Sequence, residues 1–211
     1  MVFAVCLLWL NRYYYQTSIF LIALACVPFF ARFEFKKNKA EEIVLIAIMA
    51  AAAAVSRVPF AALPGVQPVS FLIMVTAYVF GAETGFMTGA VAALVSNIFL
   101  GHGPWTPWQI FSWGLIGVVS GALRRTPLMK NGALRALLGF AFGFLFGLIM
   151  DFWHVLNFGE NISFKVVFAY FRLALPFNLA HALSNAFFIL VFFGALVKIL
   201  ERIKKKYGLL E

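Results

Sequence analysis

Two predicted helical faces carry polar side chains in a chain that is otherwise strongly hydrophobic. Asp151 and His154, in the stretch "DFWH", are three residues apart, so they share one face of a helix. Asn178, His181 and Asn185 follow one another at steps of three and four and share a second face. Polar groups at membrane depth need a partner or a function. These residue types can bind a polar ligand, hold a metal ion or relay a proton.

The stretch "GHGPWTPWQIFSWG", residues 101–114, adds three tryptophans and a glutamine at the start of another hydrophobic segment. Pro104 and Pro107 hold the connection extended and stop helix formation ahead of that segment. Aromatic faces stack on heterocycles, and a few fixed polar groups orient a ligand in a concave site. We therefore expect one pocket that opens outward. Its predicted substrate-binding residues are Arg57, Trp105, Trp108, Gln109, Trp113, Asp151, His154, Asn178, His181 and Asn185.

Each of these residues also has a purely structural interpretation. Trp105 and Trp108 fit an interfacial aromatic belt, and a single Asn or His often only hydrogen-bonds a neighbouring membrane helix. The pocket prediction depends on all of these groups lying at the same depth.

The composition assigns the chain to the membrane proteins. Of its 211 residues, 64% are hydrophobic and 12% are charged, and the mean hydropathy is +0.95. Soluble domains are about half apolar and about a quarter charged. The net charge of +9 then indicates cytoplasmic loops beside anionic lipid rather than nucleic-acid binding.

Apolar runs between polar, Pro and Gly residues predict an all-α integral membrane protein. We expect a core of six transmembrane helices from residue 42 onward, preceded by one extra N-terminal transmembrane helix. Residues 1–40 form that helix and a basic linker, and residues 41–211 form the six-helix domain with a basic tail. The first ten residues either lie at the interface or extend the first helix through "NRYYYQ". The predicted spans are 17–31, 42–57, 66–80, 84–100, 108–123, 133–156 and 167–198.

The basic residues predict the orientation. Thirteen of the 17 fall on one side when the spans alternate, in the groups 32–39, 124–135 and 198–206. The positive-inside rule makes that side cytoplasmic. We therefore expect a multi-pass protein of the cell membrane with its C-terminus inside and the 57–65, 101–107 and 157–166 connections outside.

The stretch "AIMAAAAAVS", residues 47–56, has almost no side-chain bulk. Ala47 and Ala51, like Ala50 and Ala54, are spaced by four and form a strip that lets another backbone approach closely. One interpretation is a tight crossing inside the bundle. The other is docking of a separate membrane subunit.

These features together resemble the substrate-binding (S) components of energy-coupling factor (ECF) transporters. The resemblance covers about residues 40–207, and "AAAAAVSRVPFAALPGVQPVSF" and "GHGPWTPWQIFSWGLIG" carry most of it. It implies a subunit that captures a vitamin or vitamin precursor from outside for ATP-driven uptake. Ala47, Ala50, Ala51 and Ala54 match the family's AxxxA coupling surface, and residues 58–68 match the first loop, which closes over the ligand.

The resemblance also implies the partners. These are a transmembrane coupling subunit and two ATPase subunits, with the vitamin as the small-molecule ligand and membrane lipid around the helices. No cofactor is expected, because ATP is bound only by the partner subunits and this chain has no P-loop. The "GPWTPWQ" hinge resembles the corresponding segment in a branch of the family that is proposed to carry cobalamin. Cobalamin is therefore the weakly favoured vitamin.

Two other classes remain open. A stand-alone secondary transporter would need a proton or sodium relay, which only Asp151 with His154 could supply. An intramembrane metal-dependent or proteolytic enzyme would need a ligand cluster such as HExxH or a nucleophile motif. The chain offers only "DFWH" with His181 as a third ligand. We therefore expect a protein that is not an enzyme and has no catalytic residues and no metal site.

Overall fold

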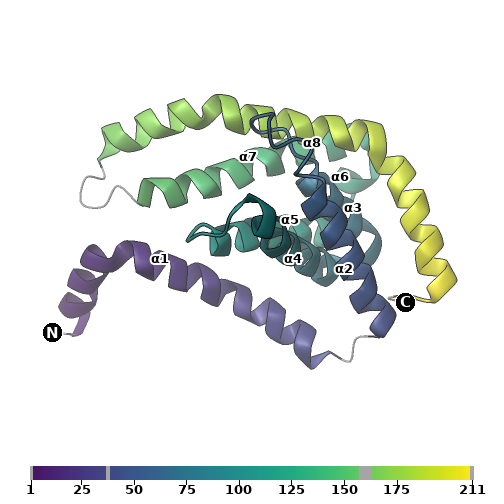
Figure 1. The fold of residues 1–211 in the computed structure, drawn as a ribbon, viewed down its shortest axis with the longest axis horizontal. Coiled ribbons are helices and arrows are strands. Elements are labelled where there is room, and N and C mark those ends of the chain that lie inside the picture. Colours follow the sequence, from purple (N-terminus) through teal and green to yellow (C-terminus); the bar gives the residue numbers. More distant parts are fainter. Residues whose placement is uncertain (1, 37–38, 157–162, 210–211) are drawn as a thin grey trace.

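The computed structural model describes residues 2–36, 39–156 and 163–209, and within these ranges every regular element is a helix. Figure 1 shows their arrangement. The expected all-α fold is confirmed. The helices are α1 (Val2–Phe35), α2 (Ala40–Val55), α3 (Val69–Phe80), α4 (Ala82–Leu100), α5 (Thr106–Leu123), α6 (Pro127–Lys130), α7 (Gly132–Leu156) and α8 (Phe164–Tyr207).

Each predicted span has a helix at its place, but the helices differ in length. Four are long and apolar enough to cross a membrane alone: Gln16–Phe35 of α1, then α4, α7 and α8. In contrast, α3 has only 12 residues, between Pro68 and Gly81, whose φ is 103°. At 1.5 Å per residue such a helix is about 18 Å long, against a hydrocarbon core of about 30 Å. The prediction that 66–80 spans as a helix is therefore too long at its start, because residues 66–68 belong to the loop that follows α2.

The short helix α3 is the centre of the bundle. Ten of its twelve residues are buried, and it contacts α2, α4, α5, α7 and α8. By comparison, α1 lies along one edge of the molecule and contacts only α4 and α5 closely among the described helices (Figure 1). The ring of Phe29 stacks on that of Phe86 at 4.4 Å. The backbone of α1 leaves helical geometry at Tyr13, so the "NRYYYQ" segment contains a kink rather than a straight extension.

Helices α4 and α5 cross at backbone contact because both carry glycines there. A Cβ on Gly117 would overlap the backbone of Gly85, and one on Gly89 would lie 2.6 Å from the carbonyl carbon of Trp113. Small residues at such crossings permit close van der Waals packing between membrane helices. The alanine strip was the only small-residue surface that the sequence analysis identified, so this pair was missed.

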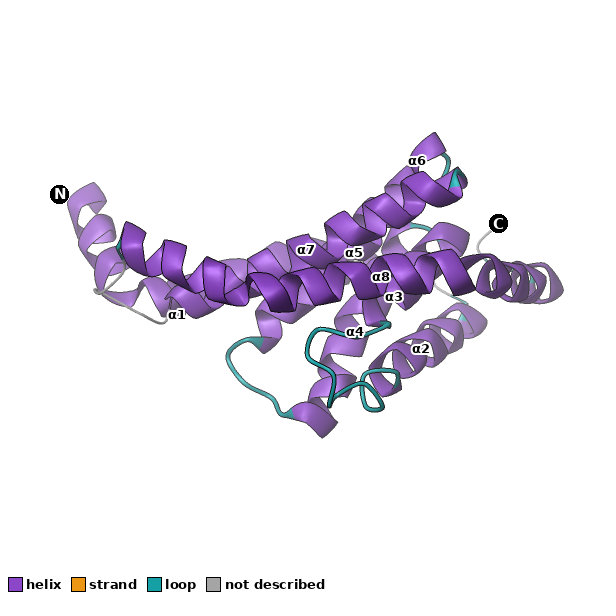
Figure 2. Cartoon of the chain, turned by 90° about the horizontal axis from the view of Figure 1, so that it is seen from above, coloured by secondary structure: helices purple, strands orange, loops and turns teal. Residues whose placement is uncertain are grey.

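The two longest helices of the core, α7 and α8, lie side by side and antiparallel (Figures 1 and 2). Gly139, Gly143 and Gly147 recur every four residues along α7 and face α8. The C-terminal part of α8 turns past the bundle, with Leu200 and Leu209 buried. There Lys39 Nζ donates to the carbonyl of Gly208 at 3.4 Å, and Lys204 Nζ to that of Val79 at 3.4 Å.

The basic residues gather at one end of the bundle, called here the basic end. It comprises the starts of α2, α4 and α7, the short α6 and the C-terminal part of α8, which lie on the right in Figure 1. The opposite end, called the loop end, carries the connections 56–68 and 101–105. Lys37 and residues 157–162 lie outside the described residues. The fold therefore brings the described members of the three basic groups to the side that the sequence predicts to be cytoplasmic.

Candidate ligand-binding site

A cavity of about 260 Å³ lies between α7 and α8 in the half of the bundle toward the loop end. Its apolar walls are Phe146, Met150, Ala174 and Phe177. Its polar lining consists of Asp151 and His154 from α7 and Tyr170 and Asn178 from α8. Three of the predicted substrate-binding residues, Asp151, His154 and Asn178, thus meet in one cavity.

The polar floor of the cavity is a pair of buried side chains. Asn178 Nδ2 donates a hydrogen bond to Asp151 Oδ2 at 2.5 Å, and the two residues are 2% and 7% exposed. Asn178 Oδ1 has no hydrogen-bond partner within the described part of the chain. Leaving a buried polar atom unsatisfied costs about 1–3 kcal/mol. Asn178 Oδ1 lies against Gly147, so the Asp151 carboxylate is the acceptor that the pair offers to a ligand with N–H or O–H groups.

The glycine strip of α7 makes room for this pair. A Cβ on Gly147 would overlap Asn178 Oδ1, and one on Gly143 would lie 2.9 Å from Asn185 Nδ2. The polar face of α8 therefore packs against bare backbone of α7. This strip is the feature that sequence reasoning missed, although the spacing of Gly139, Gly143 and Gly147 was visible.

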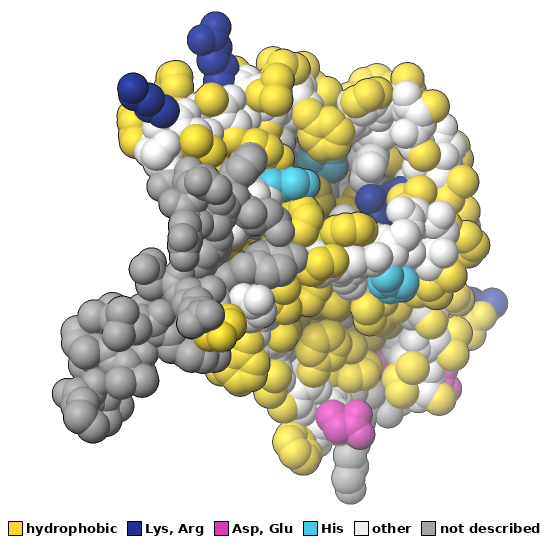
Figure 3. All heavy atoms as spheres, turned by 60° about the vertical axis from the view of Figure 1, so that its left-hand side comes forward, with side chains coloured by type: hydrophobic (Ala, Val, Ile, Leu, Met, Phe, Trp, Pro, Cys, Tyr) yellow, Lys and Arg dark blue, Asp and Glu magenta, His cyan; other side chains and the backbone are white. Residues whose placement is uncertain are grey.

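An aromatic row connects the rim of the cavity to the hinge that follows α4. His154 Nδ1 lies 2.9 Å from the carbonyl oxygen of Met150, and its ring is 5.8 Å from that of Tyr170. Trp153 contacts His154 edge-on at 4.2 Å, and Trp105 contacts Trp153 at 5.7 Å. Figure 3 views the loop end, where histidine side chains interrupt a mostly hydrophobic surface. Trp105 thus reaches the cavity through Trp153 and His154 rather than by lining it.

Behind the apolar wall lies a second layer of predicted residues. Phe146 stacks on Trp113 with ring centroids 4.8 Å apart, and it contacts the His181 ring at 5.2 Å. Trp113 is fully buried, and the Arg57 guanidinium lies 4.9 Å from its ring centre. These three residues therefore support Phe146 from inside the bundle.

The loop of residues 56–68 is fastened to the same part of α8. His181 Nδ1 donates to the carbonyl of Gly65 at 2.9 Å, and the backbone N–H of Gln67 donates to Ser184 Oγ at 3.2 Å. Arg57, near the start of the loop, donates to Gln67 Oε1 within the loop at 3.0 Å and to Ser96 Oγ of α4 at 2.5 Å. Gly65 has φ +78°, and a Cβ there would lie 2.6 Å from the carbonyl oxygen of Phe177, a cavity residue. The loop thus closes over the α8 residues that flank the cavity.

Three predicted pocket residues lie elsewhere. Gln109 Oε1 accepts from Asn97 Nδ2 at 2.7 Å, which is a contact between α5 and α4. Trp108 is buried on α5, and Asn185 is fully buried against Gly143. The expected pocket between the hinge and α8 is therefore replaced by one between α7 and α8. The connection is a turn at Pro104 and Trp105 rather than extended, and Pro107 lies in the first turn of α5. Trp108 and Gln109 are therefore helical residues that pack inward.

The cavity also contains residues that the sequence analysis did not select. Tyr170, Ala174 and Asn178 are spaced by four along α8 and form one face. Extending the Asn178 face two turns toward the N-terminus would have found them. Within the described residues, no three His, Cys, Asp or Glu side chains form a group that could hold a metal ion.

The two halves of the alanine strip have different surroundings. Ala50 and Ala54 are fully buried, and α2 packs on α4 and α3, so these two alanines form the internal crossing. Ala47 and Ala51 are exposed on a face with Val44, Ile48 and Val55. Of the two pairs, only this second one is accessible from outside the bundle.

Fold and site together define a helical membrane protein with a ligand-sized cavity between two of its helices. The family model "ECF-type riboflavin transporter, S component" matches residues 37–202, which is most of the chain, and the chain belongs to that family. The family is one of transporter components rather than enzymes. Because its description names riboflavin, it does not support the cobalamin expectation.

A curated relative is similar over part of the chain. The UPF0397 protein VS_II0189 of Vibrio atlanticus (strain LGP32) is 29% identical over 101 residues. This alignment covers 46% of this chain and 53% of the Vibrio protein, so the chain spans about half the length of that relative. No solved structure matches the chain.

Proposed function

We propose that this protein is the substrate-binding subunit of an ECF transporter and binds riboflavin, or a closely related flat heterocycle, between α7 and α8. Membership in the riboflavin-type family supports the substrate class. The observation that carries the site is the buried Asp151–Asn178 pair, which belongs to the lining of a cavity with aromatic walls.

The chemistry of this pair suits a nitrogen heterocycle. The imide edge of a flavin ring carries an N–H donor, and the Asp151 carboxylate in the cavity lining is an acceptor for it. Phe146, Phe177 and Tyr170 offer the ring faces on which a planar system stacks or makes edge contacts. Hydrogen bonds then fix the orientation while the aromatic walls contribute contact area.

The size of the cavity supports a ligand of this class over a corrinoid. Sites for drug-sized ligands are about 300–1,000 Å³. At about 260 Å³ the cavity lies just below this range, so it has room for a planar ring system and little more. A corrin macrocycle with its axial groups is several times larger than such a site accommodates.

Transport needs partners, which we propose to be a transmembrane coupling subunit and two ATPase subunits. The exposed Ala47 and Ala51, with Ile48 between them, form a smooth apolar surface on α2 for the coupling subunit. ATP is then bound by the ATPases, and the vitamin is the ligand of this chain.

We propose the orientation with the basic end in the cytoplasm. A cysteine in place of His102 should react with an impermeant maleimide in intact cells, because His102 is exposed at the loop end. A cysteine in place of Asn131, between α6 and α7, should react only after the cells are opened. The reverse labelling contradicts the orientation.

The function is tested with the purified protein. Mass spectrometry of small molecules that it retains should find riboflavin or a related flavin. Titration with riboflavin should quench the intrinsic tryptophan fluorescence, and an excess of cobalamin should leave that titration unchanged. Retention of a corrinoid, or no binding of any flavin by folded protein, contradicts the proposal.

A further inference from the structure

A second cavity of about 450 Å³ lies between α1 and the bundle, at the basic end. Its apolar lining is formed by the stacked rings of Phe29 and Phe86, with Pro28 of α1 and Val118 of α5 beside them. Arg32 and Lys36, one turn apart on α1, line its mouth. The cavity has no role in the ligand site described above, and α1 precedes the region that the family model matches.

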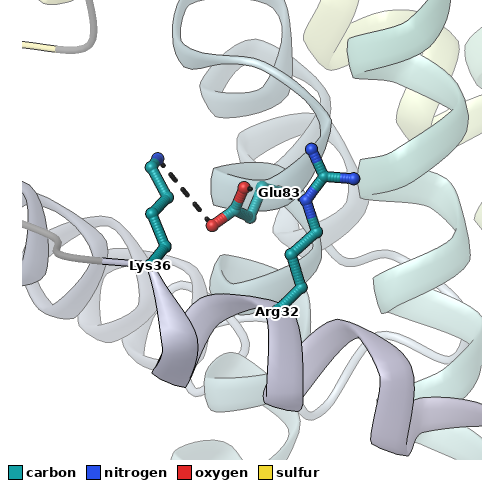
Figure 4. A network of polar contacts seen from close by, with 3 residues as sticks. All are labelled: Arg32, Lys36 and Glu83. Carbon is teal, nitrogen blue, oxygen red and sulfur yellow. Dashed lines mark ion pairs between the residues drawn. The ribbon is translucent and has the colours of Figure 1, made fainter.

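The mouth carries more positive than negative charge. Figure 4 shows the Glu83 carboxylate between Arg32 and Lys36. The contacts measure 3.6 Å to Arg32 Nε and 3.8 Å to Lys36 Nζ, which is longer than a hydrogen bond. One carboxylate therefore faces two cations.

The cations are also accessible. The side chain of Arg32 is 79% exposed and that of Lys36 is 42% exposed, whereas that of Glu83 is only 22% exposed. The Glu83 contact involves Nε of Arg32, so the terminal nitrogens of the guanidinium face outward for another acceptor. An Arg presents several donors in a planar fork, which matches a phosphate.

The depth of the site decides the kind of occupant. Phe20, Leu24 and Val27 of α1 are exposed apolar residues that face the lipid phase one to three turns before Arg32. Arg32 and Lys36 follow this apolar segment, at the level where lipid headgroups begin. A molecule that fills the cavity must therefore be anionic at its head and apolar along its length.

We propose that this cavity binds one anionic phospholipid. Its phosphate lies against Arg32 and Lys36, and an acyl chain lies along Phe29, Phe86 and Val118. The lipid fills the space between α1 and α4–α5 and so completes the packing of α1. Glu83 competes with the phosphate for the same two cations and limits the affinity.

The test uses the full chain in nanodiscs that contain phosphatidylglycerol and phosphatidylcholine. Native mass spectrometry should find phosphatidylglycerol retained in preference to phosphatidylcholine. The double variant Arg32→Gln with Lys36→Gln should lower that retention roughly thirtyfold, since each of the two cations near an anionic headgroup contributes about 1 kcal/mol. The control is Lys130→Gln with Lys205→Gln, which removes the same charge at the same end outside the cavity and should retain the lipid.

Two further variants test whether the phosphate and the acyl chain bind where proposed. Glu83→Gln should raise phosphatidylglycerol retention, because the competing carboxylate is gone. Val118→Trp should abolish retention without a change in charge, because the indole fills the apolar part of the cavity. Glycerol 3-phosphate, which has the head but no chains, should not displace the lipid.

Several results would overturn the proposal. These are equal retention of both lipids, equal loss in the double variant and its control, lower retention in Glu83→Gln, or displacement by glycerol 3-phosphate. Thermal unfolding of each variant in detergent shows whether it is folded. If the double variant does not fold, the phosphatidylglycerol retention of Glu83→Gln decides whether the proposal holds.

Discussion

The α4–α5 and α7–α8 pairs achieve close helix contact in two different ways. In the first pair both helices carry glycines, so that Gly85 meets Gly117 backbone to backbone. In the second pair the glycines are all on α7, and α8 places Asn178, Ala182 and Asn185 against them. The first crossing is a direct backbone contact, whereas the second has a cavity of about 260 Å³ near its end.

The asparagines of the two pairs differ in their hydrogen bonds, although α4–α5 also holds unpartnered buried groups such as Thr88 Oγ1 and Ser120 Oγ. Asn97 of α4 donates to Thr106 and Gln109 of α5, so its donors are used within the pair. Asn178 Oδ1 and both amide atoms of Asn185 have no partner within the described part of α7, α8 or their surroundings. A membrane helix pair gains stability from satisfied polar contacts and loses it from unsatisfied ones. We infer that Asn97 joins α4 to α5, whereas Asn178 belongs to the lining of the cavity between α7 and α8.

The largest effect on folding is expected in the α4–α5 pair. Gly117→Leu should prevent folding, because even a Cβ there overlaps Gly85 and overpacking costs about 1–3 kcal/mol or more. Gly194→Leu is the matched control, because a Cβ at Gly194 meets nothing within 4 Å. Thermal unfolding and the yield of monodisperse protein in detergent measure both. A stable Gly117→Leu protein would show that the α4–α5 contact is not as close as described.

The next largest effect concerns α2, which has one buried and one exposed alanine pair. Ala51→Trp should abolish uptake in cells while riboflavin binding to the isolated protein is unchanged, because an indole on the exposed face holds the coupling subunit away. Ala50→Trp should instead lose folded protein, because Ala50 is fully buried. If Ala51→Trp supports normal uptake, the coupling surface lies elsewhere.

A smaller effect is expected in the α7–α8 pair. Gly143→Ala should lower stability by about 1–3 kcal/mol, because its Cβ would lie 2.7 Å from Ala182 Cα. Gly132→Ala on the same helix should be neutral or slightly stabilising, since its Cβ would meet only Arg135 Nη2 at 3.8 Å. Chemical denaturation in detergent compares the two. Equal stabilities would mean that the two helices separate easily along this strip.

The sequence predicted the helices well because hydrophobic length is a strong signal in membranes. The prediction was too long at α3, where Pro68 and Gly81 bound a 12-residue helix that no apolar run reveals. It also could not divide the alanine strip, since Ala50 and Ala51 are adjacent and only the packing of α2 on α4 separates their roles.

The candidate site was predicted in its chemistry more than in its shape. Asp151, His154 and Asn178 were selected because polar groups in membrane helices are costly, and the structure brings them together. Gln109 was selected on the same argument, yet Asn97 satisfies it inside the α4–α5 pair. Depth along a helix can be read from a sequence, but which neighbour each polar group meets depends on how the helices cross.

The most direct test of the ligand site compares two asparagines on one helix. Asn178 lines the cavity, and Asn185 is fully buried two turns away against Gly143. Riboflavin binding is measured by equilibrium titration of folded Asn178→Ala and Asn185→Ala proteins. We expect Asn178→Ala to weaken riboflavin binding roughly tenfold to hundredfold, because a buried hydrogen bond worth about 1–3 kcal/mol is lost. Asn185→Ala should bind riboflavin like the parent protein. Equal affinities of the two variants, or a larger loss in Asn185→Ala, would contradict a site between α7 and α8 at Asn178.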